Sequence, residues 1–179
     1  MVVDDRQQNM AMTGKNVVHD SASDLALDGA LDGICHRLLL RVYYEDTDAG
    51  GIIYHAQYLA FAERARSAWL RCLGIDQSAM LRAEKRGFVV RRIEVDFLLP
   101  SGLGTVLEIE SRLLRLGGAS LKLQQNIINR ENGHILALLV IDLGLVEFTE
   151  GSTAKICRLP SAIKTKFSGL LTSNQIGVP

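Results

Sequence analysis

The chain lacks the composition that marks several classes of protein. Its 179 residues carry 20 basic and 20 acidic side chains, so no charge excess indicates a nucleic acid or an anionic membrane as a partner. Three cysteines, at spacings unlike those of metal sites, favour a reducing, cytoplasmic setting. The acidic N-terminus has no basic segment followed by an apolar core, which argues against a secretory signal. The best candidate for a membrane span, residues 135–146, is too short and contains Asp142.

Common catalytic motifs are also missing. There is no Gly-x-Ser-x-Gly elbow, no phosphate-binding loop and no cysteine–histidine ligand set. The run Asp46-x-Asp48-x-Gly50 resembles the start of a calcium loop, but the twelfth position holds Gln57 and a predicted strand precedes it instead of a helix. We therefore expect no metal and no cofactor. A carboxylate remains as the best available group for hydrolysis.

The first half of the chain contains a predicted strand and a long helix. Residues 36–44 alternate in polarity, which predicts a strand. A broad apolar stripe at helical spacing follows and predicts a buried helix that ends near Gly74. Residues 76–86 predict a short second helix with Asp76 as its N-cap. The stripe consists of Tyr58, Phe61, Ala62, Ala65, Ala68, Trp69, Cys72 and Leu73.

The second half of the chain predicts four strands joined by short turns. Gly117-Gly118 and Asn132-Gly133 are turn signals, and residues 134–148 are apolar on both faces, as in a covered central strand. The four ranges are 89–99, 105–114, 120–129 and 134–148, and a terminal helix is expected over 160–167. The element order predicts an α+β fold, with an antiparallel sheet of about five strands wrapped around one long buried helix.

The domain organisation follows from these elements. Residues 1–34 are polar with little periodicity and are expected to form a disordered N-terminal extension. Residues 35–168 are expected to form the domain, and residues 169–179 a frayed tail. If so, deletion of residues 1–30 leaves the melting temperature nearly unchanged.

Residues 43–55, at the junction of the first strand and the long helix, carry the most chemistry. They include Asp46 and Asp48, a diglycine that permits close backbone approach to a ligand, and a histidine. A helix start offers free N–H groups and a partial positive charge. A carboxylate such as Asp48 can attack an acyl carbonyl or activate a water, and N–H groups near Tyr54 and His55 can polarise that carbonyl.

Each of these residues has a plainer structural alternative. Asp46 and Asp48 can simply cap and solvate a loop, and His55 can be a helix-start residue satisfied by the backbone. Glu63 and Arg66, three residues apart on the helix, are expected to form a solvated ion pair. The aromatic residues of the helix stripe are expected to belong to the core.

The chain resembles the hotdog-fold acyl-CoA thioesterases of the YbgC type, which are associated with the Tol–Pal system and related to 4-hydroxybenzoyl-CoA thioesterase. The resemblance is carried by YYEDTDAGGIIYH at residues 43–55 and by QYLAFAERAR at residues 57–66. It continues through GFVVR at residues 87–91 and more weakly to about residue 160. It implies a hotdog fold and a cytoplasmic thioester hydrolase. Members of the family work as dimers or tetramers, so a homo-oligomer is implied, and a tetramer built from dimers is expected here.

The resemblance also implies roles for particular residues. Asp48 is the implied catalytic carboxylate, either nucleophile or general base, and the backbone N–H of His55 is implied to bind the thioester carbonyl. The acyl thioester is expected at a subunit interface, with the CoA arm between protomers. The substrate-binding residues expected on these grounds are Gly51, Ile52, Tyr54, Val89, Val90, Arg91, Arg115 and Ser120.

One departure from the family pattern bears on the substrate. Relatives usually carry an arginine before Gly-x-Ser in the third hairpin, where this chain has Gly117. A CoA phosphate contact is therefore lost here or made by Arg115, and an acyl carrier protein thioester stays possible beside acyl-CoA. Two other readings are a hotdog interaction subunit of an envelope-associated complex, with weak or no turnover, and a hotdog dehydratase. The dehydratase is disfavoured because no histidine–acid pair is evident on the helix.

Overall fold

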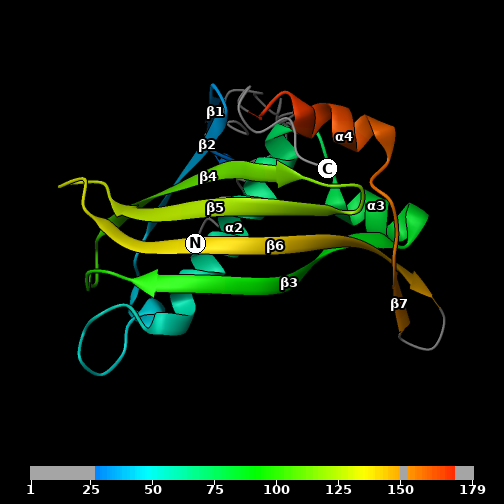
Figure 1. The fold of residues 1–179 in the computed structure, drawn as a ribbon. Coiled ribbons are helices and arrows are strands. Elements are labelled where there is room, and N and C mark those ends of the chain that lie inside the picture. Colours follow the sequence, from blue (N-terminus) through cyan, green and yellow to red (C-terminus); the bar gives the residue numbers. More distant parts are fainter. Residues whose placement is uncertain (1–26, 150–152, 172–179) are drawn as a thin grey trace, which may run out of the picture.

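A computed structural model describes residues 27–149 and 153–171, which form one antiparallel sheet packed on a central helix (Figure 1). The strand order is β1-β2-β4-β5-β6-β3, with β7 paired to β6. This is the α+β hotdog arrangement predicted from the sequence, with short β1 and β7 added to the five longer strands. In chain order the elements are β1 (Ala30–Asp32), β2 (Cys35–Arg41), the 3-10 helix η1 (Tyr44–Asp46), α2 (His55–Cys72), α3 (Gln77–Glu84), β3 (Arg86–Phe97), β4 (Val106–Leu116), β5 (Ser120–Asn129), β6 (Ile135–Thr149), β7 (Thr153–Ile156) and α4 (Ser161–Ser168).

The apolar stripe of α2 forms the core against the inner face of the sheet. Phe61, Ala62 and Ala65 are fully buried on the helix. Small alanine side chains let the helix axis approach the sheet, and the aromatic rings fill the remaining space. The inner faces of β4, β5 and β6 supply the opposing side chains, which alternate with less buried outward residues. These inner residues include Leu107, Ile109, Leu121, Leu123, Ile127, Leu139, Ile141 and Leu145.

Several local predictions are confirmed. The Asp76 side chain accepts a hydrogen bond from the Ala79 N–H at 2.9 Å and so caps α3. Gly74 follows the C-terminus of α2 with a positive φ of 64°, a conformation that glycine adopts without strain. The predicted strand 120–129 has the same bounds as β5. The prediction for β6 holds only for its inner face, since Leu138 and Val140 on its outer face are half-buried.

The ordered fold begins earlier than the predicted boundary at residue 35. Strand β1 pairs with β2, and Asp28 contacts the C-terminal half of α2. Its carbonyl oxygen lies 2.7 Å from Nε2 of buried His36, and its carboxylate accepts a hydrogen bond from Arg71 at 2.8 Å. These contacts use a backbone carbonyl and a single side chain, so they leave no periodic pattern in the sequence. The remainder of the predicted extension, residues 1–26, lies outside the described residues.

The other end of the chain packs on the C-terminus of α2. Phe167 of α4 is buried with its ring edge-on to Trp69 at 5.9 Å. Nζ of Lys166 donates to the carbonyl of Leu73 at 2.6 Å, which places a positive charge at the negative end of the helix dipole. Leu170, in the predicted frayed tail, is also buried, whereas residues 172–179 lie outside the described residues.

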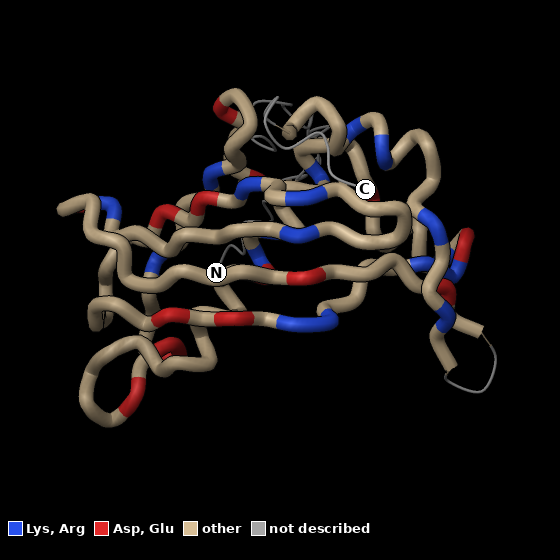
Figure 2. The backbone as a smooth tube through the Cα atoms, in the orientation of Figure 1, with Lys and Arg blue, Asp and Glu red and all other residues tan. Residues whose placement is uncertain are grey.

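Charged side chains of both signs are interspersed over the sheet (Figure 2). Arg37 on β2 pairs with Glu110 on β4 at 2.9 Å, and Arg130 pairs with Glu108. Within the described residues, no helix is long and apolar enough to cross a bilayer.

Candidate active site

The loop between η1 and α2 is closed by Asp46. This side chain is 1% exposed, and its Oδ2 accepts a hydrogen bond from the Tyr43 N–H at 2.8 Å. The Asp46 carbonyl oxygen accepts from the Tyr54 N–H at 2.9 Å, so one residue ties together the two ends of the loop. Asp46 therefore has a structural role in closing the loop, which is the plainer of the two roles that the sequence allows.

Asp48 lies at the exposed tip of the same loop. Its N–H donates to the Ile52 carbonyl, and its carbonyl accepts from the Gly51 N–H, both at 2.9 Å. Its Oδ1 accepts from the Gly50 N–H at 2.8 Å, while Oδ2 has no hydrogen-bond partner among the described residues. The carboxylate is therefore held by a tight turn but is open to a ligand.

Two glycines let this loop pack closely against the segment that precedes β4. Gly51 has a φ of +77°, which side chains other than glycine rarely adopt. A Cβ on Gly102 would lie 2.8 Å from the Gly51 carbonyl oxygen, too close for a backbone contact. The Ile53 N–H also donates to Ser101 at 2.8 Å. The position of Asp48 is thus fixed by a contact between segments about fifty residues apart.

Helix α2 starts directly after this loop. His55 is its first residue, and Tyr54 precedes it as an N-cap without a side-chain hydrogen bond. In the described part of the chain, the N–H of His55 has no acceptor. Free N–H groups at this end carry the positive pole of the helix, so they suit an oxygen that gains negative charge. The rings of His55 and Tyr54 pack together with centroids 4.3 Å apart.

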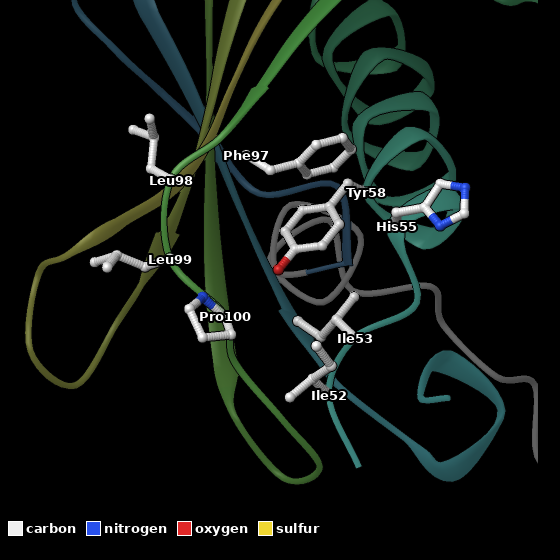
Figure 3. A pocket seen from close by; sticks show the side chains of 8 residues that line it. All are labelled: Ile52, Ile53, His55, Tyr58, Phe97, Leu98, Leu99 and Pro100. Carbon is white, nitrogen blue, oxygen red and sulfur yellow. The ribbon is translucent and has the colours of Figure 1, made fainter. Parts of the chain in front are cut away.

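A pocket of about 260 Å³ opens beside the helix start (Figure 3). The loop contributes two isoleucines, α2 contributes His55 and Tyr58, and the end of β3 with the following segment contributes the opposite wall. Its lining consists of Ile52, Ile53, His55, Tyr58, Phe97, Leu98, Leu99 and Pro100. Of the residues predicted to bind substrate, it therefore brings together Ile52 and His55, with Gly51 and Tyr54 adjoining them in the chain.

The sequence did not indicate the segment 97–100 or Tyr58 as site residues. The segment is about forty residues from Ile53, and no local pattern connects the two. Tyr58 belongs to the apolar stripe of α2, which predicts a core residue, and its ring is indeed buried. Its position could have indicated a site residue, because it lies one turn from the helix start, where the apolar stripe reaches the predicted site.

Five predicted substrate-binding residues lie far from this pocket within one chain. Val90, with its neighbours Val89 and Arg91, precedes Phe97 by seven residues along β3, roughly 23 Å. Arg115 and Ser120 flank the β4–β5 turn at the opposite end of the sheet from Gly102, roughly 30 Å away or more. Arg91 sits at an irregularity in the pairing of β3 with β6 and forms an ion pair with Asp142 at 3.4 Å.

The predicted Glu63–Arg66 pair forms, but it is not simply a solvated pair. Arg66 donates to Glu63 at 2.5 Å and also to Oε1 of buried Gln125 at 2.8 Å. Gln125 in turn donates to Ser111 at 2.8 Å. The network fixes α2 to the sheet, so Glu63 is occupied in a structural contact. No group of three or more potential metal ligands occurs among the described residues.

Comparisons with known proteins agree with this architecture. A profile of the Thioesterase superfamily matches residues 50–135. The acyl-CoA thioester hydrolase YbgC of Escherichia coli O6:H1 is 48% identical over 93 residues, which cover 52% of this chain and 69% of the relative. The acyl-CoA thioesterase YbgC of Haemophilus influenzae is 34% identical over 131 residues, 73% of this chain and 93% of the relative.

A solved structure shares the fold as well. The crystal structure of a probable thioesterase from Bartonella henselae is 36% identical with a TM-score of 0.63, and the match covers 70% of this chain and 99% of that protein. The profile match contains the buried helix α2 and the strands β3, β4 and β5. The chain therefore belongs to the YbgC acyl-CoA thioesterases of the hotdog-fold thioesterase superfamily.

Proposed function

We propose that this thioesterase hydrolyses an acyl thioester through the Asp48 carboxylate and the backbone N–H of His55, and that its substrate is an acyl-CoA. The observation that supports this is their common placement. A single tight loop carries an exposed carboxylate and leads directly into the unoccupied N–H groups at the start of the buried helix. The apolar pocket beside that helix start is suited to the acyl group.

The geometry is compatible with two routes. As a nucleophile, a carboxylate oxygen of Asp48 bonds to the thioester carbon, the thiolate leaves, and water hydrolyses the mixed anhydride. As a general base, Asp48 removes a proton from the water that attacks the same carbon. In both routes the carbonyl oxygen becomes negative in the transition state. The His55 N–H and the helix dipole stabilise that charge, and the released thiolate takes up a proton.

The test is thiol release from acyl-CoAs of increasing chain length by the wild type and Asp48→Asn. The substitution keeps the shape and the Gly50 contact but removes the charge, so we expect kcat to fall by at least about 100-fold. Asp32→Asn is the matched control, because Asp32 lies in an exposed ion pair with Arg37 that contributes little to stability. Equal rates for the wild type and Asp48→Asn would refute the role of Asp48.

The alternative function is an interaction subunit of an envelope-associated complex, as the resemblance to the Tol–Pal-associated type implies. A wild-type protein that hydrolyses neither acyl-CoAs nor acyl carrier protein thioesters would favour it. We also propose a cytoplasmic location, which the three free thiols of Cys35, Cys72 and Cys157 support, because thiols stay reduced in that compartment.

We also propose that the active form is a homo-oligomer, a tetramer built from dimers. Strand β3 lies at an end of the described sheet and pairs on one side only, with β6. Long unpaired edges are rarely left exposed, and apolar Phe97, Leu98 and Leu99 are exposed where this one ends. Antiparallel pairing of two β3 strands brings the first half of one strand alongside the second half of the other. Val89, Val90 and Arg91 of one copy then approach the pocket of the other, and Arg115 and Ser120 reach a CoA arm only from a neighbouring subunit.

A further inference from the structure

Tyr58 places a polar atom in an otherwise apolar part of the pocket. Its side chain is 4% exposed, and its ring is held edge-on against Phe97 with centroids 5.4 Å apart. Figure 3 shows the hydroxyl directed away from the helix, into the space between Ile53 and the segment 98–100. The ring is thus part of the core, whereas the hydroxyl is part of the pocket lining.

This hydroxyl makes no hydrogen bond to any of the described residues. Among the described residues, the polar side-chain atoms that are fully enclosed and have no hydrogen-bond partner are His36 Nδ1, Asp46 Oδ1, Trp69 Nε1 and Arg86 Nε, and the Tyr58 hydroxyl is not one of them. Its remaining route to a partner is the pocket itself. Buried polar groups in proteins are nearly always hydrogen-bonded, so an empty pocket supplies water to this hydroxyl. Burial raises the pKa of Tyr58, so the group stays an O–H donor.

An acyl group that fills the pocket displaces that water. A hydrocarbon chain leaves the buried hydroxyl with neither water nor another hydrogen-bond partner, which makes the free energy of binding less favourable. An acyl group with an oxygen at the same depth restores the hydrogen bond. Sites built to bond a substrate oxygen reject analogues that lack it far more strongly than apolar walls reject a missing methylene.

We propose that the Tyr58 hydroxyl is a specificity determinant that favours acyl groups carrying a hydrogen-bonding oxygen over hydrocarbon acyl groups of the same shape. The inference rests on the proposed use of this pocket for the acyl group. Tyr58 follows His55 by three residues, and helical side chains lean toward the N-terminus. The favoured oxygen therefore lies within a few bonds of the thioester carbonyl, on the acyl side.

The test uses two matched substrate pairs, butyryl-CoA with 3-hydroxybutyryl-CoA and benzoyl-CoA with 4-hydroxybenzoyl-CoA. We expect the wild type to favour the oxygenated member of at least one pair by about 10-fold in kcat/KM. Tyr58→Phe keeps the ring packing and removes only the oxygen, so we expect it to abolish that preference by accelerating the hydrocarbon member or slowing the oxygenated one. Tyr44→Phe is the matched control, because Tyr44 is 81% exposed and outside the pocket.

Two results would overturn the proposal. One is the absence of a preference in both pairs, or a preference that survives in Tyr58→Phe. The other is an equal loss of kcat for all four substrates, which would place the hydroxyl at the reacting carbonyl instead of the acyl group. If the wild type hydrolyses none of the thioesters, the proposed function fails. The four compounds are then compared as ligands by calorimetry. The ratio of Kd values within each pair, measured for the wild type and for Tyr58→Phe, decides the role of Tyr58.

Discussion

Truncation of the N-terminal segment is an experiment for which the sequence and the structure predict different melting temperatures. Deletion of residues 1–26 leaves Asp28 and strand β1 in place, whereas deletion of residues 1–30 removes Asp28 and shortens β1. The sequence predicts no difference in melting temperature between the two proteins. The structure predicts a clear one, because the ring of His36 makes one hydrogen bond to the described residues, through Nε2 to the Asp28 carbonyl.

The magnitude follows from the contacts that are lost. His36 is fully buried, and loss of the partner of its Nε2 costs about 1–3 kcal/mol. The Asp28–Arg71 pair adds less than about 1 kcal/mol, since Arg71 is 52% exposed and solvent screens the pair. A total near 2 kcal/mol corresponds to a decrease of roughly 4–8 °C in a protein of this size.

Thermal unfolding followed by circular dichroism at one protein concentration measures this difference. Asp28→Asn, made in the full chain, keeps the backbone carbonyl and weakens only the ion pair, so we expect a decrease of at most about 2–4 °C. Two truncated proteins that melt within about 1 °C of each other would show that the segment contributes no stability, as the sequence first indicated.

Two further predictions follow from buried and exposed features of the fold. Burial lowers the pKa of His36, so the unfolded chain binds the proton more readily, and stability falls as the pH drops below about 6.5. The melting temperature of the wild type should therefore decrease more between about pH 7.5 and pH 5.5 than that of His36→Phe. Equal decreases would contradict this role of His36 in the pH dependence. If the free edge of β3 pairs with a second copy, the wild type sediments as a dimer or tetramer at micromolar concentration, and a monomer would refute the assembly.

The fold was predictable because its elements leave strong local patterns. The apolar stripe from Tyr58 to Leu73 identifies the buried helix, and the alternation of residues 120–129 gives the bounds of β5 directly. Asp76 and Gly74 mark helix ends through their own backbone chemistry. The segment at Asp28 was missed for the opposite reason, since a backbone carbonyl bonded to a distant histidine has no signature in residue type.

The candidate site shows the same difference between contacts that are local in the chain and contacts between distant segments. Asp48 and Gly51 lie in one short loop and His55 begins the helix directly after it, so their proximity follows from the chain itself. The wall formed by residues 97–100 reaches the loop only through the sheet and the close approach of Gly102 to Gly51. No spacing in the sequence predicts that contact, because it depends on the relative position of β3, β4 and α2.

Tyr58 shows why burial in a core and participation in a site are not alternatives. A stripe that buries one face of a helix must end somewhere, and here it ends at the helix start, where the ring of Tyr58 packs against Phe97 at the end of β3. A residue at that position is buried through its ring and reaches the pocket through its terminal atom. For an amphipathic side chain such as tyrosine, the relevant question is therefore which atom is buried. Phenylalanine would serve the packing equally well, so the hydroxyl is the part of this residue that packing leaves unexplained.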